Sequence, residues 1–127
     1  MINASPFHLD KSGEREARMV QRVQATGLPL LYAHLVGGQD EVVFDGASFA
    51  LDAQGAVAAR AATFDEALLP VTFEGGQLSG SIAALPSLEA QAWAALVTGV
   101  RDYIGKNGFP GVIIGLSGGI DSALVLA

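Results

Sequence analysis

Cysteine is absent from the 127-residue sequence, and histidine occurs only twice, as His8 and His34. The missing cysteine excludes, within these residues, a disulfide framework, a thiolate metal site and a cysteine nucleophile. Two histidines without HExxH-like spacing give no support to a zinc site. Because His34 lies in an apolar run, we expect it to be a hydrogen-bonded core residue rather than a metal ligand.

Basic side chains and long apolar runs are also scarce. The sequence has 7 Lys and Arg residues against 13 Asp and Glu residues, which gives a formal net charge of −6. A broad nucleic-acid groove is therefore disfavoured, although a local anion site is compatible with this charge. No stretch of about 18 uninterrupted apolar residues occurs, and the amino terminus lacks a signal-peptide pattern. With 50% hydrophobic residues, these absences predict a globular cytoplasmic protein that binds neither nucleic acid nor a membrane.

Apolar periodicity and turn residues predict mixed α and β structure in the first 60 or so residues. Ser12 predicts the N-cap of a helix that continues to Gln24. The run from Leu30 to Val36 is apolar on both faces, which predicts a buried strand that Gly37-Gly38 ends. Shorter apolar runs predict the end of a strand and three further strands, at residues 1–6, 42–44, 47–51 and 56–59.

A change of composition divides the chain near residue 80. Residues 75–86 are rich in glycine and serine and lack periodicity, which is typical of a linker. Ser87 then predicts the N-cap of a second helix, which Gly108 and Pro110 end. The predicted apolar face of this helix comprises Leu88, Trp93, Leu96, Val97, Val100, Tyr103 and Ile104.

A glycine-rich turn follows an apolar strand predicted at residues 111–115 and precedes a helix-like run at 123–127. In this order the backbone N–H groups of the turn lie at the amino end of the helix, which suits a phosphate; the alternative is a plain turn capped by Ser122. Asp121 is suited to bind a magnesium ion that neutralises the same phosphates. No lysine follows the glycines, which disfavours lysine-assisted γ-phosphate transfer. The predicted nucleotide-binding residues are Gly115, Leu116, Ser117, Gly118, Gly119, Ile120, Asp121 and Ser122.

The segment from Gly115 to Ser122 resembles the PP-loop of the ATP pyrophosphatases, and residues 101–111 resemble the lead-in to that loop in NAD synthetases. The resemblance implies cleavage of ATP between its α and β phosphates. The carboxylate of deamido-NAD would attack the α-phosphorus to give an adenylate and pyrophosphate, and ammonia would then displace AMP to form NAD. Glycine amides and magnesium would stabilise the departing pyrophosphate, so this chemistry needs no side-chain nucleophile.

Residues 3–11 and 37–46 resemble the carboxy-terminal part of the nitrilase-like glutaminase domain in glutamine-dependent NAD synthetases. In that family a Glu, Lys, Cys triad hydrolyses glutamine; because this chain has no cysteine, we expect the triad before residue 1. The resemblance implies that Ser5 and Lys11 bind glutamine, since a hydroxyl can hydrogen-bond its zwitterion and an ammonium can pair with its carboxylate. From the residue types alone, a plain loop serine and a solvated lysine remain alternatives.

The remaining charged groups favour solvent-facing positions. An acidic cluster comprises Asp40, Glu41 and Asp45. Acid–base chemistry is one reading of this cluster, but the flanking glycines favour turns in which the carboxylates face water. A basic row with helical spacing comprises Arg15, Arg18 and Arg22. Such a row is typical of a solvated helix face, and a subunit contact is the alternative.

These features together predict an α/β fragment of two domains. The end of a nitrilase-like α/β sandwich domain is expected at 1–74, a linker at 75–86, and the first helix, strand and phosphate loop of a Rossmann-like PP-loop (adenine nucleotide α-hydrolase) domain at 87–127. The whole enzyme would be a homo-oligomeric carbon–nitrogen ligase acting on deamido-NAD with glutamine or ammonia, ATP and Mg²⁺, and the fragment alone would be inactive. The alternatives are another PP-loop amidotransferase, which the upstream motifs disfavour, and a nonenzymatic nucleotide-binding module.

Overall fold

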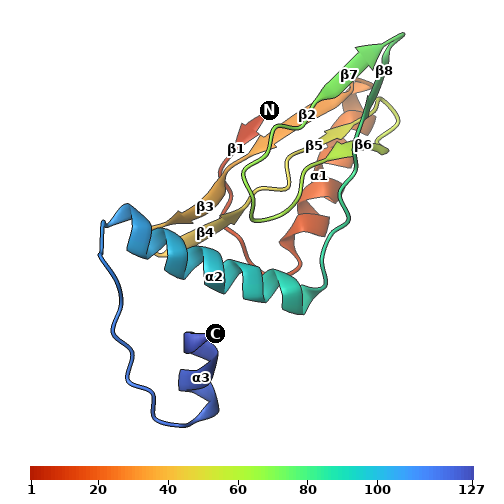
Figure 1. Cartoon of the computed structure of the whole chain (residues 1–127). Coiled ribbons are helices and arrows are strands. Elements are labelled where there is room, and N and C mark those ends of the chain that lie inside the picture. Colours follow the sequence, from red (N-terminus) through yellow and green to blue (C-terminus); the bar gives the residue numbers. More distant parts are fainter.

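The computed structural model describes residues 1–127 and shows α and β elements packed together (Figure 1). Its largest sheet has four strands in the order β1-β2-β5-β6. Strand β1 (Ile2–Asn3) runs parallel to β2 (Leu30–His34), whereas β5 (Phe49–Leu51) is antiparallel to both β2 and β6 (Val57–Arg60). Helix α1 (Lys11–Thr26) covers one face of this sheet, so the predicted α/β class is confirmed.

The hydrophobic core lies between α1 and the sheet. Met19 and Val23 on α1 pack with Tyr32, Phe49 and Leu51 on the strands. The rings of Tyr32 and Phe49 stack with their centroids 4.8 Å apart. Burial of each large apolar side chain contributes about 1.5–3 kcal/mol, so this cluster fixes α1 against the sheet.

The apolar segment from Leu30 to Val36 does not form one strand buried on both faces. Strand β2 ends at His34, and its side chains alternate between buried and exposed because α1 covers only one face. A new strand, β3 (Val36–Gln39), then pairs with β4 (Val42–Asp45) as an antiparallel hairpin. Gly37 and Gly38 are therefore strand residues, not the end of a strand. The three short strands predicted at 42–44, 47–51 and 56–59 correspond to β4, β5 and β6, with shifted ends.

The segment expected to be a linker contains half of a hairpin. Strand β7 (Val71–Glu74) pairs with β8 (Gln77–Gly80), and Gly75 and Gly76 turn the chain with φ values of 57° and 85°. Two successive positive φ values are typical of the tight turns that join antiparallel strands, so these glycines serve a turn rather than a flexible tether. Beyond β8, the chain continues along β6, where the N–H of Arg60 donates to the carbonyl of Ser81 over 2.9 Å.

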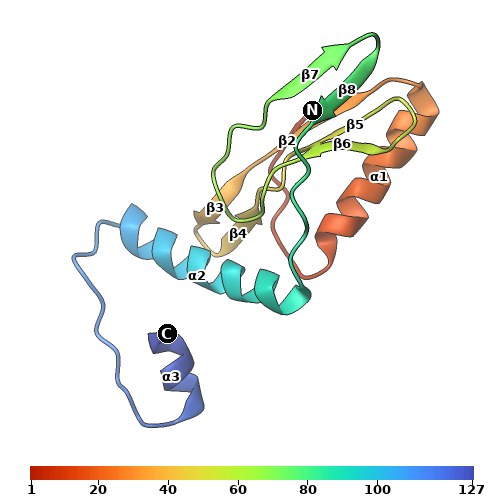
Figure 2. The same ribbon diagram turned by 45° about the vertical axis from the view of Figure 1, so that its right-hand side comes forward.

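Helix α2 (Leu88–Lys106) begins as predicted, because the Ser87 hydroxyl accepts the N–H of Ala90 over 3.3 Å. The helix runs across β3 and β4 (Figure 2). Much of its predicted apolar face is exposed: Leu96 and Val100, for example, are 60% and 58% exposed. The buried residues of α2 are instead Gln91 and Thr98.

The carboxy-terminal segment lies apart from the rest of the molecule (Figures 1 and 2). The strand predicted at residues 111–115 is not formed, because no other strand of the chain lies beside it to accept its hydrogen bonds. Helix α3 (Ile120–Leu126) has no buried residue. None of the three helices combines the length and the apolar character needed to cross a bilayer.

Candidate functional site

The loop between β1 and α1 carries both residues predicted to bind glutamine. Ser5 and Lys11 are half-buried and border one cavity of about 810 Å³, which we call the α1 cavity. The Lys11 ammonium donates to the carbonyl of Pro6 over 3.1 Å, and the N–H of Phe7 donates to the carbonyl of Val43 over 2.7 Å. The structure thus brings Ser5 and Lys11 to one cavity and attaches their loop to β4.

Two polar groups without partners border the same cavity. The hydroxyl of Tyr32 and the Nε of Arg15 are buried and make no hydrogen bond, and both residues belong to the cavity wall. Burial raises the pKa of Tyr32 above its ordinary value. A buried donor without a partner is costly, and neither atom is exposed to solvent in this structure.

Asp45 is fully buried, which contradicts the solvent-facing turn expected for it. Its carboxylate accepts two hydrogen bonds from the Arg15 guanidinium, over 2.8 and 3.1 Å, and one from the Ser12 hydroxyl over 3.0 Å. The bidentate pair and the hydroxyl compensate for the loss of water around the charge. Asp40 and Glu41, at the tip of the β3–β4 hairpin, are exposed as expected.

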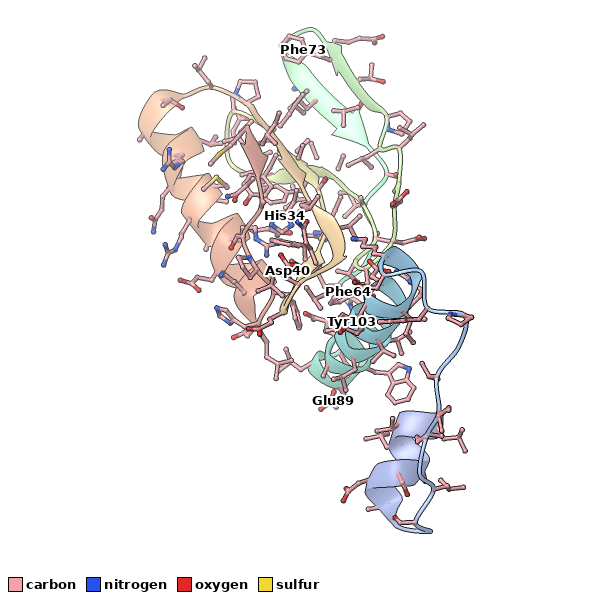
Figure 3. All side chains as sticks on the ribbon, turned by 90° about the vertical axis from the view of Figure 1, so that its left-hand side faces the viewer. His34, Asp40, Phe64, Phe73, Glu89 and Tyr103 are labelled. Atoms are coloured by element: carbon pink, nitrogen blue, oxygen red, sulfur yellow. The ribbon has the colours of Figure 1, made fainter.

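His34 is a hydrogen-bonded core residue, as predicted, and its side chain lies inside the body between α1 and the strands (Figure 3). Its Nδ1 lies 3.0 Å from the carbonyl of Gly46, which can only accept, and its Nε2 lies 3.1 Å from the N–H of Ser5, which can only donate. The ring is therefore neutral, with its proton on Nδ1. Burial, and then the charge of Arg15, lower the pKa of His34, which agrees with this state.

Helix α1 places polar residues on the same stripe as its core residues. Ser12 is not the N-cap; that position belongs to Asp10, with φ 64°, and Ser12 is free to bond Asp45. Arg15 is only 7% exposed, contrary to the solvated row expected. The sequence spacing could have predicted this burial, because Arg15, Met19 and Val23 follow one another at intervals of four residues and so share one helix face. The two arginines that are exposed, as predicted, are Arg18 and Arg22.

The predicted phosphate loop is exposed, and its Ser117 and Ser122 hydroxyl groups form hydrogen bonds within the loop itself. The Ser117 and Ser122 oxygens lie 3.1 Å apart, and the Ser122 hydroxyl donates to the carbonyl of Gly119 over 3.0 Å. Gly118 has φ 81°, a backbone conformation that favours glycine. The structure therefore forms the tight turn, but it does not place this turn at the tip of a strand.

No group of three or more His, Asp or Glu side chains could hold a metal ion in this chain. Asp121, in the first turn of α3, offers a single carboxylate and directly precedes Ser122 in the sequence. Magnesium is commonly bound by one or two carboxylates together with substrate phosphates, so this donor set fits a nucleotide-bound ion rather than a metal held by protein alone.

A contact between α2 and β3 joins the two halves of the chain, and the motifs did not reveal it. The Asp102 carboxylate accepts the N–H of Gly38 over 2.7 Å, and the Lys106 ammonium donates to the carbonyl of the same glycine. We call this pair the Gly38 clamp. The Gly38 hydrogen bond lowers the pKa of Asp102. A Cβ on Gly38 would lie 3.3 Å from the Cα of Gly99, so the glycine allows the helix to approach closely.

Comparisons with known proteins agree with the motifs. A family model described as NAD synthase matches residues 92–127. The chain is 45% identical to the glutamine-dependent NAD(+) synthetase of Xanthomonas campestris pv. campestris (strain 8004), over 98% of the chain and 24% of that protein. The corresponding protein of Rhodobacter capsulatus is 46% identical over 97% of the chain and 23% of its own length. The chain thus spans about a quarter of the length of these relatives.

Solved structures give the same result. A glutamine-dependent NAD+ synthetase from Acinetobacter baumannii, solved with adenosine diphosphate, matches 98% of the chain and 24% of its own chain at 38% identity, with a TM-score of 0.91. A glutamine-dependent NAD(+) synthetase from Cytophaga hutchinsonii matches 96% of the chain and 20% of its own at 27% identity, with a TM-score of 0.73. The resemblance predicted from the motifs is confirmed over nearly the whole chain.

Proposed function

We propose that the chain, homologous over nearly its whole length to one segment of glutamine-dependent NAD(+) synthetases, works as that segment of a glutamine-hydrolysing NAD synthetase. The reaction would be the ATP-dependent amidation of deamido-NAD through an adenylate, with release of AMP and pyrophosphate. One observation carries the proposal: a single continuous match includes both the loop with Ser5 and Lys11 and the glycine-rich loop at 115–122. A protein that shared only a phosphate loop would not match across both.

On the glutamine side, we place Ser5 and Lys11 at the wall of the site. The Lys11 ammonium would pair with the α-carboxylate of glutamine, exchanging its present bond to the carbonyl of Pro6 for a stronger charged one. The Ser5 hydroxyl would accept from the α-ammonium group or donate to the carboxylate. Residues 1–74 would form the end of the glutaminase domain.

On the nucleotide side, residues 115–122 would hold ATP in a domain that begins near residue 87, after the segment at 75–86. Backbone N–H groups of Gly118 and Gly119 would contact the departing pyrophosphate. Asp121 would hold a magnesium ion that binds the same phosphates, and this ion would stabilise the charge of the leaving group. No side-chain nucleophile is required. We further propose that the whole enzyme is a cytoplasmic homo-oligomer, which light scattering and cell fractionation would test.

The decisive experiment uses the intact protein that contains this chain, with deamido-NAD, ATP and Mg²⁺ and either glutamine or ammonia as nitrogen source. We expect NAD, AMP and pyrophosphate in equal amounts from both sources. Asp121→Asn should slow both reactions but leave glutamine hydrolysis largely unchanged, whereas Lys11→Ala should impair only the glutamine-driven reaction. Absence of NAD and AMP with either nitrogen source would refute the assignment. Equal loss of all activities in Asp121→Asn would refute the separation of the two sites.

A further inference from the structure

The backbone of Ser5 is held by one side chain, that of His34 on β2. The Ser5 N–H donates to Nε2 of His34 over 3.1 Å, across 29 residues of sequence. The ring itself is fixed from the other side, because its Nδ1 proton is donated to the carbonyl of Gly46 over 3.0 Å. The side chain is fully buried and stacks on Tyr32, with ring centroids 5.8 Å apart. His34 thus connects Ser5 to the interior of the fold.

Nε2 of His34 can accept the N–H of Ser5 only while the ring is neutral, and the charged groups around the ring bear on that state. Arg15 from α1 and Asp45 from β4 are the charged groups that face it, and Tyr32 is the other titratable neighbour. The Asp45 carboxylate lies 3.7 Å from Nδ1 but is already paired with Arg15. A second proton on His34 would therefore place an added positive charge beside the guanidinium and would turn Nε2 from an acceptor into a donor facing the N–H of Ser5.

We propose that His34 is a positioning residue for glutamine: its neutral Nε2 holds the Ser5 backbone so that the Ser5 hydroxyl faces the α1 cavity beside Lys11. This inference rests on the proposed function, since it concerns the glutamine site of that function. His34 does not itself border the cavity, and it acts through Ser5. Protonation of the ring breaks its hydrogen bond with Ser5, so glutamine binding becomes weaker at acid pH. Synthesis from free ammonia does not require Ser5 and is unaffected by this protonation.

The test compares three variants of the intact enzyme. His34→Phe keeps a ring for the stack on Tyr32 but removes both hydrogen bonds, and the KM for glutamine should rise about tenfold, with ammonia-driven synthesis unchanged. His34→Gln keeps an acceptor and a donor that do not titrate, and it should restore much of the glutamine affinity. Ser48→Ala is the matched control, because the Ser48 hydroxyl accepts the backbone N–H of His34 over 3.0 Å and does not touch the ring. Its KM for glutamine should stay within twofold of the wild type.

The pH profile supplies a second measurement, which remains informative if His34→Phe fails to fold. Because the pKa of His34 is lowered from the ordinary value of 6.5, the KM for glutamine of the wild type should rise more steeply than that of His34→Gln only at pH values below 6.5, as the pH falls through the lowered pKa. An equal rise of the KM for glutamine at acid pH in the wild type and in His34→Gln would overturn the proposal. Parallel losses of glutamine-driven and ammonia-driven synthesis in His34→Phe would also overturn it. A wild type that makes no NAD from glutamine would instead refute the proposed function itself, so the two failures are distinguishable.

Discussion

Helices α1 and α2 pack against neighbouring strands in opposite ways. Helix α1 turns its apolar residues Met19 and Val23 inward, together with two polar residues whose partners are also buried. Helix α2 turns its polar face toward β3 and β4 and leaves large apolar side chains, such as Leu96 and Val100, in solvent. An amphipathic helix usually buries its apolar face. The contrast shows that the residues of α2 that become buried within this chain are polar, whereas its large apolar side chains are not buried.

Small residues and backbone hydrogen bonds hold α2 where apolar burial holds α1. Gly38 on β3 and Gly99 on α2 let the backbones approach, and Asp102 and Lys106 bond both polar groups of Gly38. This contact is specific in geometry but buries little apolar surface, so it contributes less free energy than the core beneath α1. The experiments below separate the two packing modes, from the largest expected effect to the smallest.

Asp45→Ala should destabilise the α1 side most, by about 3–5 kcal/mol, because it leaves the buried Arg15 charge without its partner. Hydrogen exchange of the α1 amides in the intact protein would measure the loss. Glu41→Ala, at the exposed hairpin tip, is the control and should change protection by less than about 0.5 kcal/mol. Equal effects of the two substitutions would show that Asp45 is not held by the buried ion pair.

Gly38→Ala should weaken the α2 contact by about 1–3 kcal/mol through overpacking. A Cβ at this position would lie 3.2 Å from the Cβ of Asp102 and 3.3 Å from the carbonyl oxygen of Thr98, and the helix must move to accommodate it. Gly105→Ala is the matched control, because a Cβ there meets nothing within 4 Å. That control should stabilise α2, since alanine is the better helix former. Hydrogen-exchange protection of the α2 and β3 amides measures the effect of each substitution. If Gly38→Ala left this protection unchanged, the close approach of the two backbones would be disproved.

Asp102→Ala should cost about 0.5–1.5 kcal/mol, the usual net value of one hydrogen bond. The pKa of Asp102 is lowered in the folded state, so its contribution is present above the unfolded pKa of 3.8 and is lost as the pH falls through the lower folded value. Protection of the Gly38 amide, followed on going to acid pH, should therefore decline in the wild type. The same amide should be weakly protected at every pH in the variant; a parallel decline in both proteins would argue against the clamp.

Val100→Gln should have the smallest effect on how α2 sits against β3 and β4. The side chain is 58% exposed, so protection of the β3 amides should change by less than about 0.5 kcal/mol. A larger loss would mean that the outward face of α2 also contributes to this contact. In that case α1 and α2 would not differ in the way they pack against the strands.

The sequence predicted the helices and strands better than it predicted which residues are buried. Helical periodicity and the Ser87 cap predicted α1 and α2, and the apolar run around His34 predicted a buried, hydrogen-bonded histidine. Asp45 could not be placed, because an Asp-Gly pair has the same local signature in a solvated turn as at the end of a buried strand. Its burial depends on Arg15, 30 residues away, and such a pairing is a property of the tertiary fold.

Glycine gave the least reliable signal, because one residue type serves different purposes. Gly75 and Gly76 supply a hairpin turn where composition indicated a linker, and Gly38 gives room for a helix where a strand end was expected. Ser5 and Lys11, which the resemblance implied as glutamine-binding residues, border one cavity, and their role in binding stays a prediction. Strand structure before the phosphate loop could not form from local sequence alone, since a parallel strand exists only beside its neighbours.

The Gly38 clamp has an evolutionary consequence. Because Asp102 and Lys106 bond only main-chain atoms of β3, the side chains around that position are free of any requirement for complementary charge or shape toward the clamp. Selection at the junction would then act on the missing Cβ atoms of Gly37 and Gly38 rather than on a matched set of side chains. The two halves of the chain can diverge in composition while keeping the same contact, provided that positions 37 and 38 stay glycine.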